Sequence, residues 1–191
     1  MRNSIKILTV ATALVTGVSL AGCSSDDDSS TAKTTNSARS SAAAPTVDTR
    51  PECSVDAVTV TGDAGARPQI TIPDDCAPPT QLLIKDITPG TGTEVAAGND
   101  ATVQYDLVTW SDKVEKDASW NRGEPFTVEN VGQAQVIDGW NQGLIGLKEG
   151  GRRLLIVPPT LGYGRGGNGI KPNETLVFVI DAVSVAPGTA G

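Results

Sequence analysis

The side chains that could perform acid–base, nucleophilic or metal chemistry are few in this sequence of 191 residues. It contains no histidine, which excludes Ser-His-Asp and Cys-His catalysis and any zinc site built on imidazole. Its formal net charge is −7, and an acidic chain is a poor general binder of nucleic acid because it cannot release phosphate counterions. We therefore expect no cofactor, no metal and no nucleic-acid partner.

The sequence that leads to Cys23 is typical of a lipoprotein signal. Two basic residues within the first six positions precede an apolar run, residues 7–20, which is too short to span a bilayer comfortably. Residues 20–23 read Leu-Ala-Gly-Cys and resemble a bacterial lipobox, in which the cysteine is lipidated and becomes the new N-terminus. An ordinary cleaved signal with an incidental cysteine is the alternative. We predict a signal peptide at 1–22 and a lipid anchor at Cys23, which would hold the protein to the membrane of a bacterium outside the cytoplasm.

The segment after the anchor is predicted to be a disordered tether. Residues 23–50 are almost entirely Ser, Thr, Ala, Asp and Asn, and Val47 is their only large apolar residue. Such a composition cannot bury enough apolar surface to fold. The tether would either lift a folded domain off the membrane or only clear the export machinery.

The two remaining cysteines, Cys53 and Cys76, are expected to form a disulfide, because disulfides persist in exported proteins. A redox role is disfavoured because the chain has no Cys-x-x-Cys motif. Two short β-like runs, 58–61 and 69–72, lie inside the closed loop. We predict a disulfide-stapled, strand-like extension at residues 51–80, with the staple contributing on the order of 3 kcal/mol.

Three other motifs do not carry a function in this interpretation. Residues 162–167 match the Gly-x-Gly-x-x-Gly dinucleotide pattern, but a strand follows them where that fold needs a helix. The Asn-Glu-Thr sequence at 173–175 matches a glycosylation acceptor by chance. Arg152 and Arg153 are too small a group for a phosphate-binding patch, and we expect them on the exposed edge of a strand.

The elements that must position a site are mostly strands. The three tryptophans, two tyrosines and two phenylalanines all lie in the second half of the chain, so one module is expected to hold both the core and the site. Alternation over 101–110 places Tyr105 and Leu107 on one face and Asp106 and Val108 on the other. Strands are predicted at 81–87, 101–110, 125–129, 152–157 and 175–185.

One helix is predicted. Residues 138–147 place three large apolar side chains, the first of them Trp140, at i, i+4 and i+7, and the glycine pair 150–151 is expected to end the helix. Residues 111–124 are predicted to be a polar loop and 161–173 a glycine-rich loop. Many strands and one short helix predict an antiparallel α+β domain, with the helix packed on one face of the sheet.

Several blocks of residues then occur in the order and spacing of one family. They are Val136-Ile137-Asp138-Gly139-Trp140, Gly151-Arg152-Arg153, Leu161-Gly162-Tyr163-Gly164 and Thr175-Leu176-Val177-Phe178. Together they resemble the FKBP-type peptidyl-prolyl isomerase family over 81–185, and segment 53–79 looks like those that precede the domain in actinobacterial lipoproteins of the family. The resemblance implies an FKBP-like domain at 81–186, an antiparallel sheet curled around one short helix with the active pocket between them, and a C-terminal tail at 187–191.

The resemblance also implies which residues line the pocket. They are Tyr105, Asp117, Phe126, Val136, Ile137, Trp140, Tyr163 and Phe178, with Gln135 and Ile170 as further substrate-binding residues. Trp140 would form the floor, and the backbone N–H of Ile137 and the hydroxyl of Tyr163 would bond substrate carbonyls. At Lys116 the chain departs from the family, which usually has an aromatic residue there. Taken singly, Trp140 and Phe178 would be interpreted as plain core residues. Only the complete set of motifs indicates that they belong to the pocket.

The expected function is therefore cis–trans isomerisation of X-Pro bonds in exported proteins. Rotation of an amide makes and breaks no covalent bond and needs no histidine, nucleophile or metal. The implied partners are proline-containing peptides or unfolded exported proteins, with macrolides as a further ligand class, and we expect a monomer. The alternative is a non-catalytic FKBP-like module that grips proline-containing partners.

Overall fold

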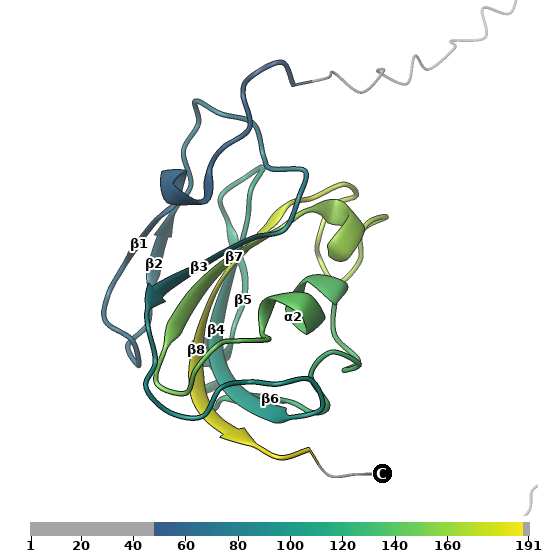
Figure 1. The fold of residues 1–191 in the computed structure, drawn as a ribbon. Coiled ribbons are helices and arrows are strands. Elements are labelled where there is room, and N and C mark those ends of the chain that lie inside the picture. Colours follow the sequence, from purple (N-terminus) through teal and green to yellow (C-terminus); the bar gives the residue numbers. More distant parts are fainter. Residues whose placement is uncertain (1–47, 189–191) are drawn as a thin grey trace, which may run out of the picture. The chain divides into compact units, whose positions relative to one another are not determined.

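The computed structural model describes residues 48–188, which form two antiparallel sheets and several short helices (Figure 1). The predicted signal peptide at 1–22, the predicted lipid site at Cys23 and most of the predicted tether lie outside the described residues. Within the part that the structure describes, no helix is long and apolar enough to cross a membrane.

The main sheet has six strands, and all its pairings are antiparallel. Its order is β3-β7-β8-β4-β5. The short strand β6 pairs with the first residues of β4, on the same edge where β5 pairs with the last residues of β4. The bounds are β3 Leu83–Thr88, β4 Asp100–Thr109, β5 Glu115–Ala118, β6 Phe126–Val128, β7 Arg152–Val157 and β8 Leu176–Ala186. The predicted strands and the antiparallel α+β class are confirmed.

The prediction of a polar loop at 111–124 is wrong from residue 115 onward. This segment contains β5 and a four-residue helix, α1 (Ser119–Arg122), which ends at Gly123 in the left-handed region at φ 72°. A four-residue strand with three charged residues is too short to show a period of two, and its pairing with β4 decides its conformation.

Helix α2 (Asp138–Gly143) packs against the inner face of the sheet, and its Trp140 and the following Leu144 are buried there (Figure 1). A β-carbon added to Gly139 would lie 2.4 Å from Cγ1 of Val157, so only glycine allows this close approach of helix and sheet. The prediction that the helix continues to residue 147 is wrong. The backbone groups of residues 146 and 147 instead exchange hydrogen bonds with Val95 at 2.8 Å.

The expectation that Arg152 and Arg153 lie on an exposed strand edge is also wrong. Strand β7 lies between β3 and β8, and the two residues are 0% and 5% exposed. Arg152 forms a buried ion pair at 2.6 Å with Asp181, its register partner on β8. The arginine pair in the sequence shows its charge but not the partner that allows it to be buried.

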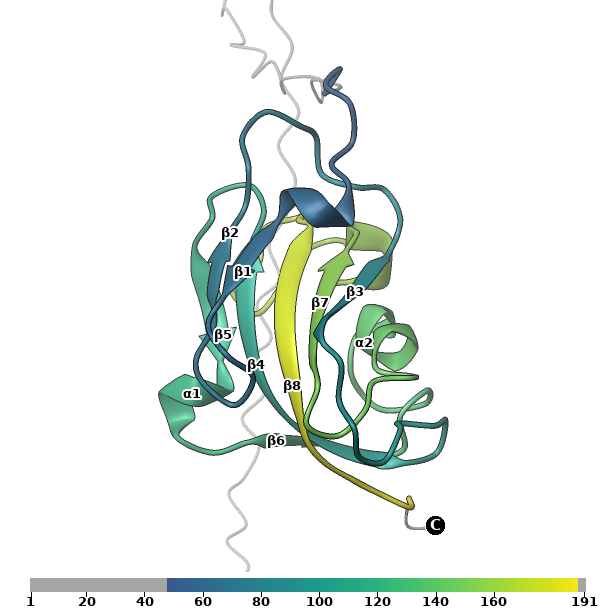
Figure 2. The same cartoon turned by 60° about the vertical axis from the view of Figure 1, so that its left-hand side comes forward.

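The disulfide between Cys53 and Cys76 and the two short strands of the extension are confirmed. A 3-10 turn, η1 (Val55–Ala57), leads into β1 (Thr59–Thr61), which pairs with β2 (Gln69–Thr71). This hairpin covers the outer face of the main sheet, so the sheet lies between the hairpin and α2 (Figures 1 and 2). The cluster that joins them consists of Cys53, Val58, Ile72, Val108, Trp110, Leu154, Ile156, Val177 and Val179.

Candidate functional site

A row of side chains on the inner face of the main sheet forms one wall of a cavity. Leu107 on β4 lies directly opposite Phe178 on β8 and Asp117 on β5. Tyr105, two residues before Leu107, shares this face because side chains of a strand alternate. The alternation of β4 and its register with β5 and β8 therefore bring aromatic, aliphatic and polar side chains to one surface.

A β-bulge at Lys116 turns Asp117 toward this surface. Glu115 pairs with Val108 and Asp117 pairs with Leu107, so Lys116 is an extra residue between two consecutive positions of β4. Without the bulge, Glu115 and Asp117 would share one face. With it, Asp117 lines the cavity while Glu115 bonds Arg67 of the extension at 2.5 Å.

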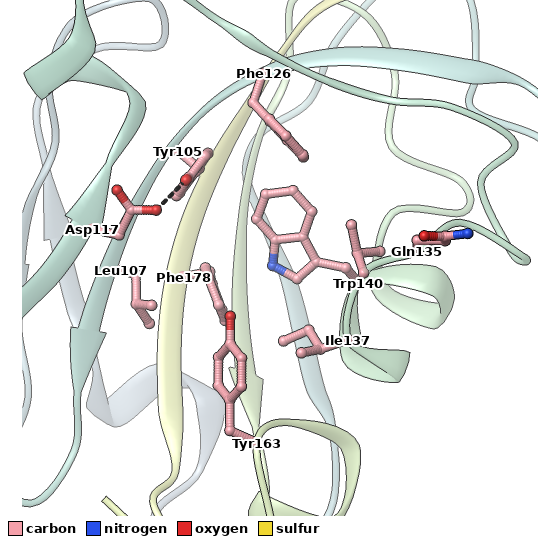
Figure 3. Close-up of a pocket in the computed structure, with 10 residues that line it drawn as sticks. Tyr105, Leu107, Asp117, Phe126, Gln135, Ile137, Trp140, Tyr163 and Phe178 are labelled. Carbon is pink, nitrogen blue, oxygen red and sulfur yellow. Dashed lines mark hydrogen bonds between the residues drawn. The ribbon is translucent and has the colours of Figure 1, made fainter. Parts of the chain in front are cut away.

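Trp140 of α2 forms the floor of the cavity, which has a volume of about 220 Å³ (Figure 3). Its ring meets Tyr105 and Phe178 edge to face, with ring centroids 5.2 and 5.4 Å apart. Phe126 of β6 closes the rim at 6.1 Å from both Trp140 and Tyr105, and 39% of it is exposed. Edge-to-face packing fixes the rings with respect to one another and leaves an apolar hollow between them.

The polar side of the cavity is a network of three side chains. The Tyr105 hydroxyl donates a hydrogen bond to Asp117, and Arg122 of α1 donates to both, at 2.7 Å to the hydroxyl and 2.6 Å to the carboxylate. Burial and the Asp117 carboxylate raise the pKa of Tyr105 to about 12. The phenol therefore stays protonated at physiological pH, and the network holds Asp117 in place rather than supplying a base.

Three hydrogen-bond donors at the cavity have no partner among residues 48–188. They are the backbone N–H of Ile137, the hydroxyl of Tyr163 and Nε1 of the buried Trp140. Ile137 immediately precedes α2, and Tyr163 follows the 3-10 turn η2 (Pro159–Leu161). In Figure 3 the Tyr163 hydroxyl points toward Phe178. The cavity thus offers donors to a ligand that has carbonyl oxygens on an otherwise apolar body.

The structure brings most of the expected site residues together. Those that line the cavity are Tyr105, Asp117, Phe126, Gln135, Val136, Ile137, Trp140, Tyr163 and Phe178. Ile170 does not line the cavity and is buried in the same core cluster as Trp140 and Phe178. Lys116 does not line the cavity, and its ammonium bonds Asp112 at 3.1 Å.

Leu107 and Arg122 belong to the site but were not among the expected residues. Leu107 could have been found, because the period of two places it on the face of Tyr105. Arg122 gives no such signal, because it reaches the site only through side-chain bonds from a helix of one turn. No cluster of metal-ligating side chains occurs in the part of the chain that the structure describes.

Comparison with known proteins gives a consistent result. The family model described as FKBP-type peptidyl-prolyl cis-trans isomerase matches residues 92–183. A protein of Streptomyces anulatus named FK506-binding protein is 48% identical over 122 residues, which are 62% of this chain and 97% of that protein. A probable FK506-binding protein of Corynebacterium glutamicum is 40% identical over 119 residues, 62% of this chain and 98% of that protein.

Solved structures agree with the sequence relatives. The crystal structure of FkpA from Escherichia coli superposes with a TM-score of 0.52 at 36% identity, over 58% of this chain and 50% of that one. The crystal structure of AtFKBP13 superposes with a TM-score of 0.50 at 33% identity, over 56% of this chain and 95% of that one. The chain belongs to the FKBP-type peptidyl-prolyl cis-trans isomerase family.

Proposed function

We propose that the cavity under Phe126 binds the proline of an X-Pro segment in exported proteins and accelerates rotation about the preceding peptide bond. The observation that carries this proposal is the combination in one hollow of edge-packed aromatic rings and unpartnered donors. A proline ring is apolar and carries no N–H, while the carbonyls on either side of it need donors. An X-Pro segment therefore matches both the apolar and the polar parts of the cavity.

The reaction needs no group that the chain lacks. The barrier to peptide rotation is about 18–20 kcal/mol because the planar amide is stabilised by resonance. In the twisted amide this resonance is lost and the group is less polar. An apolar cavity therefore disfavours the planar amide relative to the twisted one, which is differential binding of the transition state.

In this mechanism each cavity residue has a defined part. Trp140 supports the proline ring from below, with Tyr105 and Phe178 against its sides. The Ile137 N–H and the Tyr163 hydroxyl donate to substrate carbonyls and so hold the chain on both sides of the bond that rotates. Asp117 and Val136 complete the lining, and Gln135 extends the surface that meets the substrate.

We further propose that the protein acts outside the cytoplasmic membrane as a lipid-anchored monomer. The signal-like residues 1–22, the lipobox cysteine Cys23 and the Cys53–Cys76 disulfide support this location. The proposed order is signal peptide, tether at 23–50, extension at 51–80, isomerase domain at 81–186 and tail at 187–191. The extension shares a buried cluster with the domain, which suggests that the two fold together.

A non-catalytic binding module is the second candidate, and Lys116 favours it. This residue stands where the family usually has an aromatic ring, and its side chain turns away to Asp112, so one wall of the cavity lacks a ring. Such a module would retain proline-containing peptides, and macrolides as apolar ligands of the same cavity, without useful turnover.

A protease-coupled assay on short Leu-Pro and Phe-Pro peptides separates the two candidates. The full chain, purified in detergent, should accelerate isomerisation, and Tyr163→Phe and Asp117→Val should lower turnover without loss of the folded state. Glu94→Gln, on an exposed ion pair remote from the cavity, is the control and should keep the wild-type rate. Saturable peptide binding without turnover would reject the enzyme and support the binding module.

The anchor is tested separately by acyl labelling in cells. Labelling should be lost in Cys23→Ala, because no other residue of the lipobox can carry the lipid. Labelling that persists in this variant would contradict the lipobox assignment.

A further inference from the structure

Two lysines converge on the carboxylate of Asp112, in the turn that joins β4 to β5. The ammonium groups of Lys116 and Lys171 each lie 3.1 Å from the same oxygen, Oδ2. The other oxygen, Oδ1, accepts hydrogen bonds from the Thr109 hydroxyl and the Val114 N–H. The carboxylate is thus oriented by its own turn and presents one oxygen to both lysines.

The two lysines belong to two different segments, each of which also carries a residue that lines the cavity. Lys116 is the bulge residue of β5 and directly precedes Asp117. Lys171 lies in the loop between β7 and β8, the loop that carries Tyr163 near its start. In Figure 3, Asp117 and Tyr163 stand on different sides of the cavity. A bridge from Lys116 through Asp112 to Lys171 therefore connects the segments that carry these two residues.

A backbone hydrogen bond connects the two ends of the loop that carries Lys171 and Tyr163, so a shift of Lys171 should also shift Tyr163. The Asn173 N–H donates to the Gly164 carbonyl at 2.8 Å, which brings the end of the loop back to the residue after Tyr163. Beside the bridge, the buried Glu174 accepts bonds from both the N–H and the hydroxyl of Ser111, at 2.8 and 2.6 Å. The turn that holds Asp112 is thus already attached to the end of the loop.

We propose that Asp112 is a positioning residue for the isomerase: it binds Lys116 and Lys171 together and so sets the separation between the strand that carries Asp117 and the loop that carries Tyr163. This inference rests on the proposed function of the cavity. The inference also gives a role to Lys116. Where the family usually has an aromatic ring, this chain has a lysine that forms one end of the ionic bridge. The Thr109 hydroxyl and the two lysines hold the pKa of Asp112 well below its usual range, so the bridge stays charged at all physiological pH values.

The bridge is sensitive to salt because it is partly exposed. The side chains of Lys116, Asp112 and Lys171 are 20%, 27% and 60% exposed. Exposed ion pairs are individually weak and are screened by salt. Opening the bridge should therefore loosen substrate binding without unfolding the domain, and KM should change more than kcat.

The test compares Asp112→Asn with the wild-type full chain in low salt. The variant should raise KM for an X-Pro peptide about threefold or more, with kcat within twofold and an unchanged melting temperature. Asp112→Glu should have the KM of the wild type. The double variant Lys171→Met/Asp112→Asn should have the same KM as Asp112→Asn alone. Adding 1 M NaCl should raise the wild-type KM and leave that of Asp112→Asn unchanged. The peptide dissociation constant, from tryptophan fluorescence, should follow KM.

The control is Asp74→Asn. It removes the ion pair that Asp74 forms with Lys113, a residue of the same turn as Asp112, and it does not affect Lys171. This variant should leave KM unchanged. An unchanged KM and dissociation constant in Asp112→Asn would overturn the inference, as would a loss of kcat that parallels a loss of melting temperature. A wild-type chain without turnover would reject the proposed enzyme instead. The dissociation constants of the same variants would then still decide whether the bridge positions the cavity.

Discussion

Replacing Asp181 by asparagine should destabilise the protein far more than an ordinary loss of a hydrogen bond. The Arg152 guanidinium donates to both Asp181 oxygens, at 2.6 and 2.7 Å, and the two side chains are 0% and 7% exposed. The same guanidinium donates to the carbonyls of Gly62 and Ala66 in the hairpin loop of the extension. Asp181→Asn leaves this arginine charged, buried and without a counter-charge.

The magnitude follows from the burial. Removing one partner of a buried ion pair costs about 3–5 kcal/mol. For about 140 ordered residues the entropy of unfolding is about 0.3 kcal/mol/K, so the melting temperature should fall by about 10–17 °C. Because Asp181 also accepts a bond from the Gly65 N–H at 2.8 Å, the hairpin should lose protection in hydrogen exchange before the sheet does.

The matched control is Asp86→Asn, which breaks the ion pair with the neighbouring Arg153. Asp86 is 43% exposed on its side chain, and Arg153 keeps its bonds to the carbonyls of Gly143 and Ile145 at 2.8 Å. We expect a loss of about 1 kcal/mol here. Equal losses of melting temperature in the two variants, measured by calorimetry, would refute the reasoning that burial of both partners, the carboxylate included, sets the cost.

Three further predictions concern the same framework. Burial raises the pKa of Asp106 to about 6, so the folded state binds this proton more tightly than the unfolded state. The stability of Asp106→Asn relative to wild type should therefore rise between pH 4 and 7, by at most about 3 kcal/mol. A difference in melting temperature that does not change with pH would contradict this. Replacing Cys53 and Cys76 by serine should cost about 3 kcal/mol in urea unfolding, and an unchanged midpoint would show that the staple is dispensable. Gly139→Ala should push α2 away from Val157 and lower both stability and turnover, and normal values for both would exclude the close packing as a requirement.

The parts of the fold with a clear period could be predicted from the sequence. Alternation over β4 predicted the shared face of Tyr105 and Leu107, because one face of this strand meets α2 and the other meets the extension. The burial of Arg152 could not be predicted, because its partners lie far away in the chain and include backbone carbonyls. The helix end was misplaced for a related reason, since Val95 takes up the backbone groups that would have continued the helix.

The residues of the candidate site that belong to sequence motifs could be predicted. Trp140, Tyr163 and Phe178 occur in recognisable blocks, and the structure places them with Tyr105 and Phe126 around one cavity. Ile170 lies outside the cavity lining, and its expected contact with the substrate stays a prediction. Arg122 and Asp112 make their contacts through side-chain bonds across short loops, and single residues of this kind leave no pattern in a sequence.

The central claim is that the cavity floored by Trp140 catalyses rotation of X-Pro bonds, and NMR exchange spectroscopy tests it without a coupling protease. Cis and trans signals of a Leu-Pro peptide interconvert over tens to hundreds of seconds without catalyst. With catalytic amounts of the full chain we predict exchange faster by at least tenfold, and a return to the uncatalysed rate in Tyr163→Phe/Trp140→Leu. An exchange rate equal to that of the free peptide, at concentrations where the peptide is bound, would contradict the account.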